Sequence, residues 1–138
     1  MKITKIHIKN YRSLEDITIY PRSILALIGS NNSGKSSVLN ALELFFEASK
    51  ELINAECFHY KHTGEPIEIF LTFEQLSAWE KEQFGPWMEG DKLVVGRQIP
   101  CMTEGLYEIQ TFAVKNVPEQ EWLQDKKTCL KQNPIVVF

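Results

Sequence analysis

Residues 29–36, which read Gly-Ser-Asn-Asn-Ser-Gly-Lys-Ser, carry the clearest chemistry in the chain. Their types and spacing fit G-x-x-x-x-G-K-[ST], a loop whose backbone N–H groups surround phosphate oxygens. Gly29 and Gly34 permit backbone angles that a side chain would block. Lys35 adds a positive charge that reaches β- and γ-phosphates, and the Ser36 hydroxyl is a hard oxygen ligand suited to Mg²⁺. The loop therefore predicts a site for a nucleotide and Mg²⁺.

The segments on either side of this loop are those that the motif requires. Residues 23–28 are nearly all apolar, which is typical of a strand buried on both faces of a sheet. From Lys35 to about Lys50, apolar residues cover most of a helix circumference and leave one narrow polar stripe. This pattern predicts a mostly buried helix whose N-terminal N–H groups and positive dipole end face the phosphates. Ser37, in its first turn, could donate to the α-phosphate.

The rest of the chain reads as strands with short helices. Alternating or apolar runs predict strands at residues 6–8, 17–20, 67–73, 92–99 and 106–114. Short helices are expected at residues 74–84 and from Pro118 onward. The predicted fold is α/β, with a mixed sheet around the helix that follows the phosphate loop. Residues 1–50 hold the first strands and that helix, and residues 55–138 form a strand-rich remainder.

Composition bounds the class of protein. The 138 residues suit one domain, and 43% hydrophobic with 24% charged residues is ordinary for a globular chain. A net charge of −3 argues against coating nucleic acid by bulk charge, although a local basic groove stays possible. No apolar run approaches the ~18 residues of a membrane span. The three cysteines form no paired motif, which favours a reducing cytoplasm.

The sequence stops at residues 134–138, an apolar run that looks like an incoming strand. Domains usually end in polar residues. A truncated chain and a natural end both stay open, and we expect residues 1–138 to form a single, incomplete lobe.

A longer stretch of the sequence resembles a known family. It comprises Ile6-His7-Ile8-Lys9-Asn10-Tyr11-Arg12-Ser13-Leu14, then Ile17-Thr18-Ile19, then the run from Ile24 to Ser37. This stretch resembles the N-terminal ATP-binding lobe of the SMC/RecF-like ABC ATPases. Within that branch it is most similar to the OLD-type (overcoming lysogenization defect) ATPase–nucleases, including those of antiphage systems. The specific resemblance covers about residues 1–50.

The resemblance implies a P-loop NTPase fold that binds ATP and Mg²⁺. It also implies a homodimer or a larger assembly with other ATPase lobes, and DNA as a partner of the full complex. Arg12 is expected near the phosphates or the partner surface, with a solvated turn arginine as the alternative. The nucleotide-binding residues are then Arg12, Gly29, Asn31, Asn32, Ser33, Gly34, Lys35, Ser36 and Ser37, with Ser36 as the Mg²⁺ ligand.

The departures from that family matter as much as the matches. The sequence has no LSGG-type signature, no apolar run ending in Asp-Glu, no late switch histidine and no Toprim nuclease region. We therefore name no catalytic residue and expect an ATPase-family lobe without activity in isolation. Two alternatives stay open. One is a complete small NTPase, and the other is a stand-alone module that regulates a partner by binding nucleotide or protein.

Two other groups of residues favour structural readings. Glu56, Cys57, His59 and His62 do not have the spacing of a four-ligand zinc site, so a solvated loop is expected over residues 55–65. The tryptophans lack interleaved basic residues, which favours core or interface packing over base stacking; they are Trp79, Trp87 and Trp122.

The sequence contains no Asn-Lys-x-Asp element to read guanine. A nucleotide should then be held by its phosphates and by stacking of its base, for which Tyr11 and its neighbours are the candidate platform. We predict that ATP is not rejected in favour of GTP. Competition binding with the two nucleotides tests this, and a strong preference for GTP would contradict it.

Overall fold

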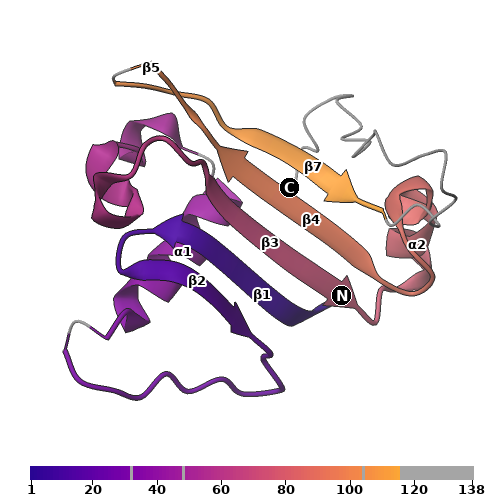
Figure 1. Cartoon of the computed structure of the whole chain (residues 1–138). Helices are drawn as coiled ribbons and strands as arrows, with labels where there is room; N and C mark the ends of the chain where they lie inside the picture. The colour runs from indigo at the N-terminus through magenta and orange to yellow at the C-terminus, as the bar shows by residue number, and fades with distance from the viewer. Residues whose placement is uncertain (32, 48, 104, 116–138) are drawn as a thin grey trace, which may run out of the picture.

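The central feature of the computed structural model is a five-stranded sheet, and the model describes residues 1–31, 33–47, 49–103 and 105–115. The sheet order is β2-β1-β3-β4-β7 (Figure 1). The strands are β1 (Lys2–Tyr11), β2 (Leu14–Ile19), β3 (Ile67–Glu74), β4 (Leu93–Ile99) and β7 (Gln110–Val114). A small ribbon, β5 (Cys101–Thr103) with β6 (Leu106–Tyr107), extends from the end of β4.

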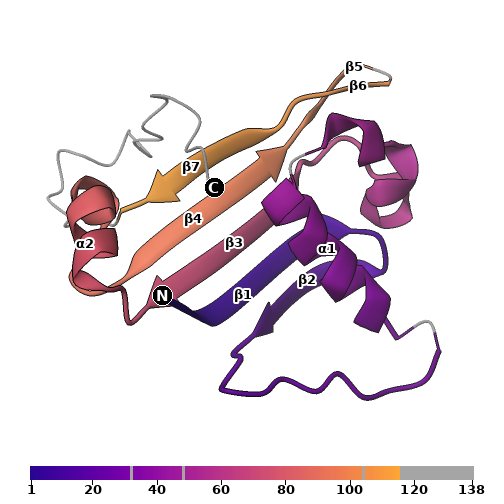
Figure 2. The ribbon, with the colours of Figure 1, turned by 180° about the vertical axis from the view of Figure 1, so that it is seen from behind.

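The helix α1 (Lys35–Glu47) lies across one face of the sheet, in front of the strands in Figure 2. Alternate residues of β3 point to this face, and Ile67, Ile69 and Leu71 are fully buried there. They belong to one core cluster together with the buried residues of α1. The alternation predicted for residues 67–73 is therefore confirmed, and the core lies between the sheet and α1.

Arg97 of β4 fastens the C-terminal end of α1. Its side chain is buried, and its Nη1 donates to the carbonyl oxygen of Leu44 at 3.0 Å. The guanidinium lies 5.2 Å from the ring centroid of Phe45, and Nε donates to Thr111 Oγ1 at 3.1 Å. Because α1 has no basic residue in its own last turn, Arg97 supplies the cation that favours the negative end of the helix dipole. Burial lowers the pKa of this guanidinium from its ordinary value.

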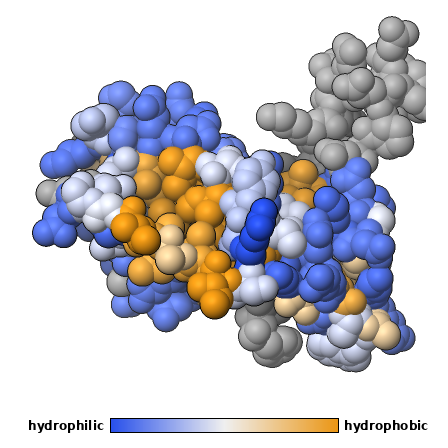
Figure 3. Space-filling model, turned by 90° about the horizontal axis from the view of Figure 1, so that it is seen from below, coloured by the Kyte–Doolittle hydropathy of each residue, from blue (hydrophilic) through white to orange (hydrophobic). Residues whose placement is uncertain are grey.

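The expected strand at residues 23–28 is not formed. Ile24 and Ile28 are 88% and 92% exposed, and no described strand pairs with this segment. A strand buried on both faces needs neighbours on either side, which the described residues do not provide. The helix α1 is also less buried than predicted, with Leu39 and Phe46 exposed. Figure 3 shows apolar surface gathered on the side seen from below.

The sheet itself differs from the expectation in one respect. The α/β class is confirmed, but every pairing among the described strands is antiparallel, where a mixed sheet was expected. A parallel neighbour would have come from the segment at residues 23–28, which stays outside the sheet. No helix in the described part of the chain is long and apolar enough to cross a membrane.

Two of the predicted elements have other boundaries than expected. The second helix is α2 (Ala78–Phe84), which begins later because Ser77 and Glu80 form a capping box. The strand expected over residues 106–114 is divided between β6 and β7. The segment at residues 55–65 contains short 3₁₀ turns in which Cys57 and Phe58 are buried, but most of its other residues, including Glu56 and His62, are exposed, as expected for a solvated loop.

Trp79 is 66% exposed, against the expected packing. Trp122, the helix from Pro118 and the strand at residues 134–138 lie outside the described residues.

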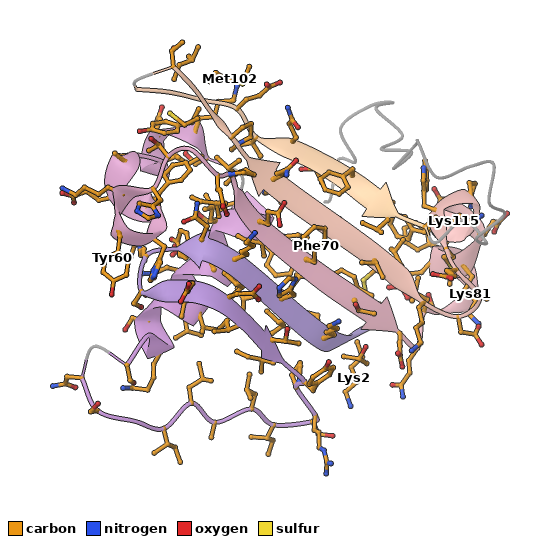
Figure 4. The ribbon with its side chains drawn as sticks, viewed as in Figure 1. Lys2, Tyr60, Phe70, Lys81, Met102 and Lys115 are labelled. Atoms are coloured by element: carbon orange, nitrogen blue, oxygen red, sulfur yellow. The ribbon has the colours of Figure 1, made fainter. Side chains whose placement is uncertain are left out.

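Gly96 makes the sheet sensitive to one added methyl group. It lies opposite Phe70 of β3 and Phe112 of β7, and Figure 4 labels Phe70 on the sheet. A Cβ at Gly96 would lie 2.6 Å from Phe70 Cε1 and 2.7 Å from Phe112 Cε2. We predict that Gly96→Ala lowers the free energy of unfolding by about 1–3 kcal/mol, as overpacking does.

Urea unfolding measures this change. Gly64→Ala is the matched control, because nothing lies within 4 Å of a Cβ at Gly64. Equal stability of the two variants would contradict the argument.

Candidate nucleotide-binding site

The phosphate-binding loop ends at Gly34, where the backbone has a φ of 88°. This left-handed conformation disfavours a side chain. A Cβ at Gly34 would also lie 2.8 Å from Leu14 Cδ2 and 3.2 Å from Ser13 Oγ. The N–H of Val38 donates to the Gly34 carbonyl at 3.0 Å and begins the helix. Glycine is therefore required both by backbone angle and by the close approach of the turn between β1 and β2.

The Lys35 ammonium lies inside the loop. Its Nζ donates to the carbonyl oxygens of Gly29 at 2.8 Å and Ser30 at 2.5 Å, and to Ser33 Oγ at 3.1 Å. These bonds use all three donors of the ammonium group. The first turn of α1 contains no acidic residue, so the helix does not neutralise its own positive end. The loop and the helix together present positive charge to the same space.

The turn between β1 and β2 forms the opposite wall. Ser13 Oγ lies 2.9 Å from Ser37 Oγ, which ties the turn to the first turn of α1. A pocket of about 610 Å³ lies between the turn and the loop, a size within the range of small-molecule sites. Its lining residues are Arg12, Ser13, Asn31, Gly34, Lys35, Ser36 and Ser37.

The structure brings most of the predicted nucleotide-binding residues to this pocket. Those that line it are Arg12, Asn31, Gly34, Lys35, Ser36 and Ser37. Gly29 and Ser33 instead contact the Lys35 ammonium, and Asn32 lies outside the described residues. Sequence reasoning missed Ser13, because a serine in a turn is common and its role follows only from the approach of the turn to Gly34.

Tyr11 cannot serve as the expected stacking platform for a base. Its side chain is 2% exposed and belongs to the core cluster. Burial raises the pKa of its phenol, and the Arg12 guanidinium lies 5.4 Å from its ring centroid. Because Tyr11 is a core residue, it is unavailable for stacking, and the residues of this turn that line the pocket are Arg12 and Ser13.

The donor groups of the pocket fit a magnesium nucleotide. The Ser36 hydroxyl is exposed and makes no hydrogen bond to another described residue, so its oxygen is available to a hard cation. Arg12 forms no ion pair with a described residue, and its guanidinium suits phosphate oxygens. The described residues contain no group of three His, Cys, Asp or Glu that could hold a metal ion. The Ser36 hydroxyl, which lines the pocket, would hold Mg²⁺ together with the phosphates of a nucleotide.

The antiparallel sheet with α1 across one face, the left-handed backbone at Gly34 and the Lys35 loop define a P-loop NTPase-like protein. The chain belongs to the AAA ATPase domain family, whose profile matches residues 1–133. It is 35% identical over 85 residues to endonuclease GajA of Bacillus cereus (strain VD045). That match covers 60% of this chain but 14% of GajA, so the chain spans a small part of this relative's length.

A solved structure shares the fold. It comes from work on the structural biochemistry of ATP-driven dimerization and DNA-stimulated activation of SMC ATPases. The TM-score is 0.56 at 17% identity, and the match covers 80% of this chain and 69% of the other. These findings confirm the predicted resemblance to an SMC/RecF-like ATPase lobe.

Proposed function

We propose that this chain binds Mg-ATP in the pocket between the phosphate loop and the β1–β2 turn, as the ATP-binding lobe of an OLD/RecF/SMC-like ATPase. The observation that carries the proposal is the convergence of three positive groups on one pocket: the Lys35 ammonium, the N-terminal end of α1 and the Arg12 guanidinium. None of the described residues that line the pocket is acidic. This combination attracts an anion of high charge such as a nucleoside triphosphate.

Binding requires an exchange of partners at Lys35. The ammonium gives up bonds to Gly29, Ser30 or Ser33 and takes phosphate oxygens in their place. Charge-assisted bonds to phosphate are stronger than those to neutral oxygens, so the exchange favours the bound state. The N–H groups at the start of α1 and the Arg12 side chain hold the remaining phosphate oxygens. Mg²⁺ bound with Ser36 neutralises part of the phosphate charge.

The wider role that we propose is nucleotide-gated association. ATP held on one lobe completes a site with another lobe or subunit, in a homodimer or a larger assembly. The exposed apolar side chains of Ile24, Leu25 and Ile28 support association, because such surface favours a covered state. The likeness to endonuclease GajA supports a part in an ATPase–nuclease that processes DNA, with DNA bound through the full complex. A place in antiphage defence is the narrower form of this proposal. We also propose a cytoplasmic setting, because the three cysteines do not have the spacing of a disulfide framework.

Loss of the loop lysine should remove most of the ATP affinity. We predict that Lys35→Ala weakens Mg-ATP binding by at least about tenfold, because a hydrogen bond to a charged group contributes about 1.5–3 kcal/mol. Calorimetric titration measures the dissociation constants. Lys81→Ala is the matched control, since Lys81 pairs with Asp91 at 2.6 Å, away from the pocket. Equal affinities of the Lys35 and Lys81 variants would contradict the proposal.

The chain alone should not hydrolyse ATP appreciably. Phosphoryl transfer needs a group that orients the attacking water and a further acid near Mg²⁺, and none of the described lining residues carries a carboxylate. We predict phosphate release well below ~1 s⁻¹, the low end of ordinary turnover. The measurement uses the purified chain with Mg-ATP, and Lys35→Ala gives the background. Turnover above that level, lost in the variant, would instead support a complete small NTPase.

A further inference from the structure

The backbone of Arg12 is held on both sides by a segment that is distant in the sequence. The N–H of Arg12 donates to the Cys57 carbonyl at 2.8 Å. The carbonyl oxygen of Arg12 lies 2.7 Å from His59 Nδ1. Between these two bonds, an isolated β-bridge pairs Tyr11 with Phe58. Residues 57–59 therefore fix the backbone of the turn that contains Arg12, a residue that lines the pocket.

Both sides of this contact have strained backbones. Five described residues other than glycine have a positive φ, and four of them lie here: Asn10, Arg12, Tyr60 and Lys61. A left-handed conformation is strained for residues that carry a side chain, and it persists where surrounding contacts enforce it. The buried Asn10 side chain adds two bonds, from Nδ2 to the carbonyl oxygens of His62 at 3.1 Å and Glu65 at 2.8 Å. Concentrated strain of this kind points to a constrained functional feature.

We propose that His59 is a positioning residue for the nucleotide, acting through Arg12. Its Nδ1–H donates to the Arg12 carbonyl and fixes the left-handed turn, which directs the guanidinium to the pocket. This inference rests on the proposed Mg-ATP site. His59 does not line the pocket, so any effect on ATP passes through the turn.

The bond matters because the Arg12 side chain has few other restraints. Arg12 is exposed and its guanidinium contacts the Tyr11 ring, with no ion pair to a described residue. A carbonyl oxygen only accepts, so Nδ1 must carry the proton. The neighbouring Tyr60 ring, 4.3 Å from the His59 ring, is 81% exposed and points away from the molecule in Figure 4. Without the Nδ1 donor, one of the two backbone anchors of Arg12 is lost.

Two substitutions separate the hydrogen bond from the ring. His59→Phe keeps an aromatic ring but has no donor, whereas His59→Asn keeps an amide N–H near the place of Nδ1. Calorimetric titration of the full chain with Mg-ATP gives the affinity of each. We expect His59→Phe to weaken binding about three- to tenfold, where the upper value corresponds to losing the charge-assisted contact between Arg12 and a phosphate. His59→Asn should remain within about twofold of the original chain.

The same titrations in an Arg12→Ala background test whether the effect of His59 on ATP binding passes through Arg12. There, His59→Phe should have no further effect, because its target is gone. If the original chain binds Mg-ATP and His59→Phe binds it equally well, the inference about His59 is overturned while the proposed function stands. The same weakening with and without Arg12 would overturn it too. Absence of Mg-ATP binding by the unaltered chain would overturn the proposed function, and this inference with it.

Discussion

The close contact between Gly34 and the β1–β2 turn is the constraint on which the site depends. Leu14 Cδ2 and Ser13 Oγ occupy the space that a side chain at Gly34 would need. Leu14 is itself 5% exposed and belongs to the core, so the phosphate loop rests directly on packed residues. The bond between the Ser13 and Ser37 hydroxyls adds a polar tie at the same place. The start of α1 and the turn that carries Arg12 therefore keep a fixed relation, because a well-packed core resists small displacements.

The other end of α1 is held by a different device. Arg97 reaches from β4 to the Leu44 carbonyl, with its guanidinium against Phe45. A buried cation that forms no ion pair with a described carboxylate carries a desolvation cost, which the helix carbonyl, the Thr111 hydroxyl and the aromatic ring offset in part. Anchored at both ends, α1 holds its positive end against the pocket. The position of one helix is thus the link between the sheet and the phosphate site.

The sequence predicted those parts of the fold and site that depend on local pattern. The loop and α1 follow from spacing and periodicity, and β3 follows from strict alternation. The failures lie where distant residues decide. The apolar segment at residues 23–28 reads as buried, but burial needs neighbours that the described sheet does not supply. His59 contacts Arg12 across 47 residues of chain, and no local signal marks that contact. Tyr11 reads as an accessible ring because alternation does not reveal which face of a strand a helix will cover.

The net charge of the chain does not reveal the positive charge of the pocket. The whole chain carries a net charge of −3, yet the described residues that line the pocket include Arg12 and Lys35 and no acid. Some of the acidic side chains form ion pairs with lysines away from the pocket, as Glu65 does with Lys9 and Glu74 with Lys92. These ion pairs contribute little to stability. Because their carboxylates are paired away from the pocket, the electrostatic potential in the pocket is set mainly by its cations and the helix dipole. In the proposed site, cations and hydroxyls would hold the phosphate charge, and none of the described residues that line the pocket is a carboxylate. The proposed binding step therefore uses other groups than hydrolysis would, because hydrolysis needs an acid near Mg²⁺ and a group that orients the attacking water.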